Sequence, residues 1–106
     1  MDSRIVIVAY KPLPGKENEL KALVRSHHLG LKAEDLVTDR TPIIAGTSNG
    51  SIIEIFEWKS IEAIHAAHSN SAVLAMWDEF AQVCTYLPAS EIQEFHQIFS
   101  DFSPLN

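Results

Sequence analysis

The spacing of hydrophobic and polar positions divides the N-terminal part of the chain into a strand and a helix. Ile5 to Tyr10 form a continuous apolar run, which is typical of a central strand with apolar neighbours on both faces. A segment rich in proline and glycine ends this run. From Lys16 to about Glu34 apolar residues recur every three or four positions, which predicts an amphipathic helix. Gly30 weakens this helix by only about 1 kcal/mol and is not expected to end it.

A β-hairpin is predicted next. Asn49-Gly50 is a strong signal for a two-residue type I′ turn, because both positions of that turn need positive φ. The turn stands between Thr41–Thr47 and Ser51–Trp58, and the second of these segments is rich in β-branched and aromatic residues. We therefore expect the two segments to pair. Pro42 lacks an N–H group and favours an edge position for the first of them.

The turn also sets the expected register of the hairpin. A two-residue turn places Ala45 opposite Glu54 and Ile43 opposite Phe56. These pairs would share one face of the sheet with Trp58, because side chains alternate between the two faces along a strand.

The following segment predicts a helix that is interrupted once. Ser60 is a good N-cap directly after the strand, and Ser69-Asn70-Ser71 are three residues that prefer caps and turns. Beyond this break an apolar stripe resumes and runs to Cys84, and Pro88 ends the segment. Cys84 is therefore expected to lie on the helix, where an unpaired cysteine is more often a small core residue than a reactive thiol.

The C-terminal region is expected to supply the last strand. Ser90 to Phe95 has the pattern of a short helix, and Ile98–Pro104 has that of an extended segment, where we place the fourth strand. Strand, helix, two strands, helix and strand in this order favour a ferredoxin-like βαββαβ fold of the α+β class. The expected antiparallel sheet has the order 4-1-3-2, with both helices on one face, and residues 1–106 form one domain. A second copy of the chain is the simplest cover for the other face, which predicts a homodimer.

Composition narrows the classes of function. With 46% hydrophobic and 21% charged residues, the 106-residue chain has the composition of an ordinary globular domain. A formal net charge of −6 and the lack of any Lys or Arg cluster remove the electrostatic basis for binding nucleic acid or an anionic membrane. The longest apolar runs are far shorter than the roughly 20 residues of a transmembrane helix, and no signal peptide is expected. A single cysteine suits a reducing, cytoplasmic compartment.

Three segments carry a family resemblance: Tyr10-Lys-Pro-Leu-Pro-Gly-Lys-Glu17, Ile53-Glu-Ile-Phe-Glu-Trp-Lys-Ser60, and the Ala63…His68…Val73 pattern. They resemble the dimeric α+β barrel superfamily, and within it the group similar to antibiotic biosynthesis monooxygenases. The resemblance extends to about Pro88. It implies a homodimer whose two sheets close into a barrel, with a pocket in each subunit. Some members oxidise polyketide-type aromatic compounds without metal or flavin, some degrade haem, and many have no known activity.

The haem-degrading branch of this superfamily is a poor match. Its characteristic Asn on the first strand would fall near Val8, and its His on the second helix would fall near Trp77. Haem degradation is therefore not expected, and we expect no cofactor.

Glu54 is the strongest candidate for a catalytic residue. It lies in a strand between Ile52 and Phe56, which share its face. A carboxylate in such surroundings is either desolvated and suited to taking a proton, or paired with Arg40 or a histidine. The alternative is that the edge of the sheet leaves this face exposed to water.

His68 is the second catalytic candidate. It precedes the helix break and could turn toward the sheet, where a neutral imidazole acts as an acid or base near pH 7, or it could be a partly exposed residue at a helix end. Glu62, His65 and His68 share one helix face, but no zinc motif has this spacing. We therefore expect no metal.

Five further residues are candidates for binding a substrate. His27 lies in the apolar stripe of the first helix, where a histidine is either a hydrogen-bonded core residue or part of a pocket. Arg40 is either half of a solvated pair with the preceding Asp39 or a group that holds a substrate anion. The aromatic candidates, which are core residues or the walls of a site for an aromatic ligand, are Trp58, Trp77 and Tyr86.

These residues leave three functions open. The chain is either a cofactor-independent monooxygenase that acts on an aromatic or polyketide-like compound, with Glu54 or His68 as the base, or a homodimer that binds a ligand without catalysis. The third alternative is a structural or interaction protein whose barrel is filled by side chains. A cavity lined by Glu54 and His68 would favour the first two functions, and a packed interior would favour the third.

Overall fold

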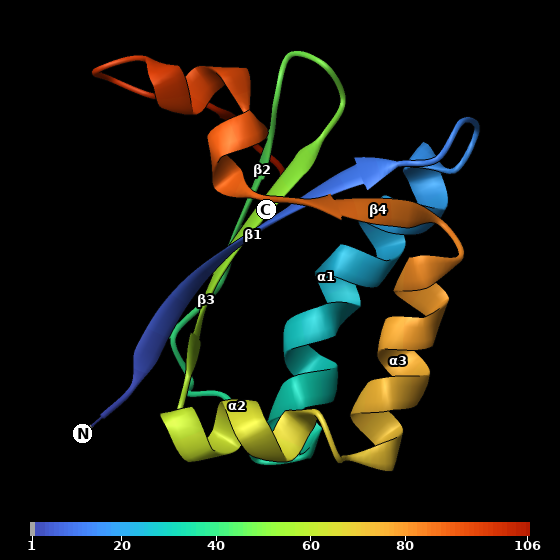
Figure 1. Ribbon diagram of the computed structural model, residues 1–106, viewed down its shortest axis with the longest axis vertical. Helices are drawn as coiled ribbons and strands as arrows, with labels where there is room; N and C mark the ends of the chain where they lie inside the picture. Colours follow the sequence, from blue (N-terminus) through green and yellow to red (C-terminus); the bar gives the residue numbers. More distant parts are fainter. Residues whose placement is uncertain (1) are drawn as a thin grey trace.

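The computed structural model describes residues 2–106, and it confirms the predicted α+β fold (Figure 1). Its helices are α1 (Glu17–Ala33), α2 (Ile61–Ala67) and α3 (Ser71–Ala81). Its strands are β1 (Arg4–Pro12), β2 (Ile43–Gly46), β3 (Ile52–Trp58), β4 (Cys84–Leu87) and β5 (Ser103–Pro104). Two 3-10 turns, η1 (Ala89–Glu91) and η2 (Gln93–His96), lie between β4 and β5.

The strands form one antiparallel sheet with the order β4-β1-β3-β2-β5. Its first four strands have the predicted order 4-1-3-2, and β5 adds a short fifth strand at the edge of β2. The helices lie together on one face of the sheet, with α1 and α3 side by side and α2 near the end of β3 (Figure 1). This is the predicted ferredoxin-like arrangement with one strand added.

Two side-chain caps explain why the second helical segment is divided. The Ser60 hydroxyl accepts the N–H of Ala63 at 3.0 Å, and the Asn70 side-chain oxygen accepts the N–H of Val73 at 3.0 Å. Each cap satisfies one of the N–H groups that a helix leaves free at its start. The predicted interruption at Ser69-Asn70-Ser71 is confirmed.

Gly30 lies where α1 and α3 approach each other closely. A Cβ atom at this position would stand 2.7 Å from the sulfur of Met76 on α3. A larger residue at position 30 would therefore require the Met76 side chain to move.

The predicted register of the hairpin is wrong by one residue. Glu54 lies opposite Ile44, and Ile43 lies opposite Ile55, so Ala45 and Ile43 point to the face away from Glu54. The loop has three residues between Thr47 and Ser51, whose backbone groups bond at 3.0 Å, rather than two. Gly50, the last residue of this loop, has the positive φ that a three-residue loop requires there, with a value of 90°.

The predicted position of the fourth strand is also wrong. The strand that pairs with β1 is Cys84–Leu87, directly after α3, and Cys84 lies opposite Pro12. Helix α3 ends at Ala81, so Cys84 is a buried strand residue and not a helical one. The physical reason is that a β-favouring run follows the helix and Pro88 then prevents further strand pairing. The segment Ile98–Pro104 contributes only the two residues of β5.

The face of the sheet away from the helices is partly covered. Ile92 from the C-terminal segment packs against Ala9 and Ile53 in the middle of this face. Nearer the N-terminus of β1, Ile5 and Ile7 are 60% and 47% exposed. An apolar part of the sheet is therefore open in the single chain.

None of the helices within residues 2–106 has the length and apolar character needed to cross a membrane.

Candidate functional site

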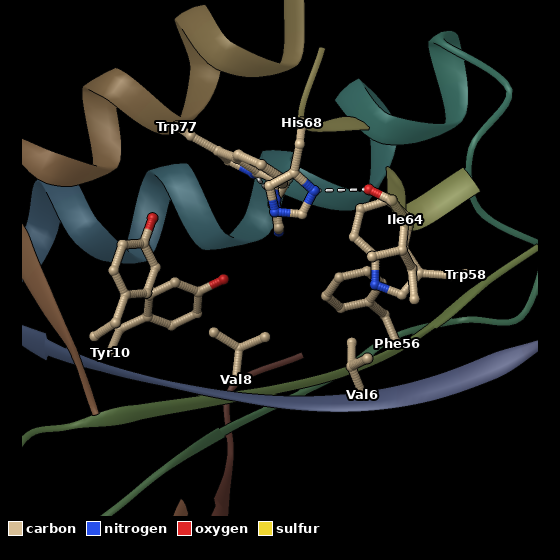
Figure 2. Close-up of a pocket in the computed structure, with 10 residues that line it drawn as sticks. Val6, Val8, Tyr10, Phe56, Trp58, Ile64, His68 and Trp77 are labelled. Atoms are coloured by element: carbon tan, nitrogen blue, oxygen red, sulfur yellow. Dashed lines mark hydrogen bonds between the residues drawn. The ribbon is translucent and has the colours of Figure 1, made fainter. Parts of the chain in front are cut away.

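A cavity of about 410 Å³ lies between the helix-covered face of the sheet and the helices (Figure 2). Strands β1 and β3 form its floor and α1, α2 and α3 contribute to its other walls. Its lining residues are mostly aliphatic or aromatic: Val6, Val8, Tyr10, His27, Phe56, Trp58, Ile64, His68, Trp77 and Tyr86. The cavity is thus an apolar chamber with a few polar groups in its wall.

A buried carboxylate supports one side of this chamber. Glu54 on β3 is 0% exposed and lies behind Tyr10 and His27, which both line the cavity. The Tyr10 hydroxyl donates to Glu54 Oε1 at 2.5 Å, and His27 Nδ1 lies 2.9 Å from Oε1 and 3.1 Å from Oε2. The length of the tyrosine bond is that of an O–H group donating to an ionised carboxylate. Glu54 therefore orients two wall residues without facing the cavity itself.

The indole of Trp77 determines which nitrogen of His27 carries the proton. Trp77 Nε1 donates to His27 Nε2 at 3.0 Å, and an indole N–H can only donate. His27 Nε2 must therefore accept, which leaves the proton on Nδ1, where it is donated to Glu54. The result is a continuous chain of hydrogen bonds from α3 through α1 to the sheet.

Burial keeps the nearby phenols and the thiol protonated. Burial and the adjacent Glu54 carboxylate raise the pKa of Tyr10 far above its ordinary value, and burial raises the pKa of Tyr86 to about 12. Burial likewise raises the pKa of Cys84 to about 11, and its Sγ–H donates to the Phe80 carbonyl at 3.2 Å. The Cys84 thiol is a core group and not an activated nucleophile.

His68 stands at the opening of the cavity. Its Nδ1 lies 2.8 Å from the carbonyl oxygen of Ile64, four residues earlier on α2, so Nδ1 carries a proton and donates it. Figure 2 shows the other ring nitrogen, Nε2, turned toward the sheet and the cavity. The ring also packs edge-on against Trp77, with centroids 5.3 Å apart. His68 is exposed enough to meet both solvent and a ligand.

The structure brings most of the sequence candidates together. His27, Trp58, His68, Trp77 and Tyr86 all line the cavity, and Glu54 lies directly behind its wall.

Arg40 does not join this group, which corrects the prediction that it could hold a substrate anion or Glu54. Its Nε donates to Glu57 Oε1 at 3.1 Å, and the described lining of the cavity does not include it. Glu57 comes three residues after Glu54 on β3, so its side chain points to the opposite face of the sheet. Hydrogen bonds from Thr38, Ser3 and Arg40 lower the pKa of Glu57 to about 2.

Tyr10 is the functional residue that sequence reasoning missed. It is the last residue of an apolar run, where it had the pattern of an ordinary strand residue. On the sheet it lies opposite Ile52, one position along the same face from Glu54. The pairing of β1 with β3, which would have indicated this contact, joins segments more than 40 residues apart in the sequence. Val6, Val8, Phe56 and Ile64 are further wall residues that the sequence did not single out.

Within residues 2–106, no three His, Cys, Asp or Glu side chains converge as they would around a metal ion.

Comparison with known proteins identifies the fold. The structure is similar to that of Rv0793 from Mycobacterium tuberculosis, with a TM-score of 0.62 and 18% sequence identity. The similarity covers 82% of this chain and 94% of that one. No protein-family model matches the chain, and no curated protein matches it. At this identity the likeness shows a common fold, and the resemblance to antibiotic biosynthesis monooxygenases stays a prediction.

Proposed function

We propose that this chain binds a small, largely apolar ring compound in the cavity between its sheet and its helices. The observation that carries the proposal is the cavity of about 410 Å³ with its aromatic and aliphatic wall. Pockets for small molecules span about 300 to 1,000 Å³ and combine an apolar lining with a few polar groups. The side chains of His68 and Tyr86 supply such polar groups.

The alternative of a structural protein with a packed interior has less support. Well-packed interiors contain few voids larger than a water molecule, and one water occupies about 30 Å³ of liquid. A chamber more than ten times that size, bounded by Trp58, Trp77 and Phe56, is large enough to hold a fused ring system.

Filling the cavity should abolish binding. Val8 lies on its floor, so Val8→Trp places a bulky ring where the ligand would lie and should weaken the binding of 2-naphthol at least about tenfold. Lys11→Trp is the matched control, because Lys11 is an exposed residue on the opposite face of the same strand. Isothermal titration of both variants and the unmodified chain measures the effect. Equal affinity in Val8→Trp and the unmodified chain, or no saturable binding by the latter at millimolar 2-naphthol, contradicts the proposal.

A cofactor-independent oxygenase is the second candidate function, supported by His68 Nε2 at the cavity opening and by the family resemblance. His68 would take a proton from an activated CH₂ between two rings, and O₂ would be the oxidant. The CH₂ becomes a carbonyl with one atom of O₂, and the other atom leaves as water. Oxygen uptake that matches conversion of anthrone to anthraquinone, and that is lost in His68→Leu, tests this candidate; uptake no faster than the uncatalysed rate rejects it.

We further propose that the chain functions as a homodimer. Ile5 and Ile7 form an apolar area on the open sheet face, and such an area is typically covered in an assembly. Sedimentation at micromolar concentration should show twice the mass of one chain. A folded monomer under these conditions would contradict the proposal.

A further inference from the structure

Several polar groups in the cavity wall donate their hydrogen to another part of the protein and not to the cavity. His68 is the clearest example. Its Nδ1–H group is donated to the Ile64 carbonyl at 2.8 Å, so its neutral ring has only a lone pair on Nε2. That nitrogen points into the cavity (Figure 2). His68 therefore presents a hydrogen-bond acceptor, fixed in place by the backbone of its own helix.

Three other wall residues also direct their hydrogens away from a ligand, and one of them is His27, whose Nδ1–H is donated to Glu54. The Tyr10 hydroxyl donates to Glu54 at 2.5 Å, and the Trp77 indole donates to His27 at 3.0 Å. The remaining polar hydrogens in the wall belong to the Trp58 indole and the Tyr86 hydroxyl, which can meet acceptor atoms of a ligand. The only N–H group of the neutral His68 ring is already donated to the Ile64 carbonyl, so His68 offers a ligand an acceptor and no donor.

The electrostatics of the wall disfavour anions. The described lining contains no Lys or Arg, and the Glu54 carboxylate lies one side chain behind it, in contact with Tyr10 and His27. A carboxylate ligand would lose its hydration and meet a buried negative charge with no cation to offset either cost.

We infer that the cavity selects a neutral ring compound carrying an O–H or N–H group, which it donates to His68 Nε2, and that it rejects carboxylates. This inference rests on the proposed binding function and names the class of its ligand. His68 is the residue that determines the specificity.

Three naphthalene compounds test the inference: 2-naphthol, which donates a hydrogen bond, 2-methoxynaphthalene, which cannot, and 2-naphthoate, which is an anion. Titrations run at a pH of about 8, where an ordinary imidazole is neutral. The unmodified chain should bind 2-naphthol about fivefold more tightly than 2-methoxynaphthalene, as expected for one net hydrogen bond. It should show no saturable binding of 2-naphthoate.

The variant His68→Leu removes the acceptor and should bring the ratio of the two neutral affinities close to one. His65→Leu is the control, because His65 is an exposed residue on the same helix outside the cavity lining, and it should keep the ratio. His68→Gln retains an acceptor oxygen and should restore part of the preference. Circular dichroism checks that each variant is folded.

The outcomes separate this inference from the proposed function. Equal affinity of the unmodified chain for the two neutral compounds, or tighter binding of 2-naphthoate, overturns the inference and leaves the binding function intact. An unchanged ratio in His68→Leu shows that another group accepts the hydrogen bond, which also overturns the inference. Failure of all three compounds to bind overturns both.

Discussion

His27→Leu is expected to lower the free energy of unfolding by about 3 kcal/mol. The substitution keeps a helix-forming residue of similar size on α1 but removes the donor to Glu54 and the acceptor for Trp77. Glu54 is then a fully buried carboxylate with one remaining donor from Tyr10. Urea denaturation followed by far-ultraviolet circular dichroism measures the loss.

His28→Leu is the matched control for this prediction. His28 is the next residue of α1, it is also buried, and its Nε2 bonds only to the Thr38 carbonyl at 3.1 Å. The loss there should be about 1 kcal/mol, the typical value of a neutral hydrogen bond. A loss in His27→Leu no larger than that in His28→Leu would show that the Glu54 network does not contribute to stability.

The double variant His27→Leu with Glu54→Leu isolates the interaction. Removing the carboxylate together with the histidine takes away the buried charge that the single variant leaves short of donors. The double variant should therefore be less destabilised than the sum of the two single variants, by about 2 kcal/mol. Additive losses would mean that the two side chains are not energetically coupled in spite of their 2.9 Å contact.

Phe80→Ala is expected to lower the free energy of unfolding by about 4 kcal/mol. Phe80 on α3 is 0% exposed, stacks on Tyr10 at 5.2 Å and packs edge-on against His27 at 5.1 Å between centroids. Its removal leaves a cavity behind the two residues that Glu54 orients, and neither ring can move to fill it without breaking a hydrogen bond.

Leu74→Ala serves as the control for the Phe80 variant, since Leu74 is on the same helix and is 46% exposed. It should cost well under about 1 kcal/mol. A loss below about 2 kcal/mol in Phe80→Ala would show that the core around Tyr10 and His27 is not closely packed.

Local signals predicted the elements of this fold better than their pairing. The caps at Ser60 and Asn70 could be identified because a cap depends on residues within one turn. The hairpin register could not, since Asn49-Gly50 is compatible with a two-residue turn and also with the three-residue loop that the structure has. A single residue of difference moved Ile43 and Ala45 to the other face.

The misplaced fourth strand has a similar cause. Phe80 and Cys84 are four residues apart, which continues the helical stripe of α3 beyond its true end at Ala81. Periodicity alone does not distinguish a helix that continues from a strand that begins with an apolar residue at the same spacing.

The candidate site was predictable in its residues but not in its connections. Glu54 stood out because a carboxylate between large apolar residues needs a partner. Its partners are Tyr10 and His27, which come from two other elements, and only the assembled sheet and helix bring them within hydrogen-bonding distance. Arg40 was predicted to hold a substrate anion or Glu54 because of its charge alone. Its partner is Glu57, which the alternation of side chains along β3 places on the face opposite Glu54.

Methyl NMR spectra recorded during a titration with 2-naphthol test most directly whether the cavity is a binding site. We expect saturable shifts in the methyl signals of Val6, Val8 and Ile64, which line the cavity, and unchanged signals for Ile5 and Ile7 on the opposite face of β1. Shifts confined to Ile5 and Ile7, or no saturable shift at Val6, Val8 and Ile64, would contradict it.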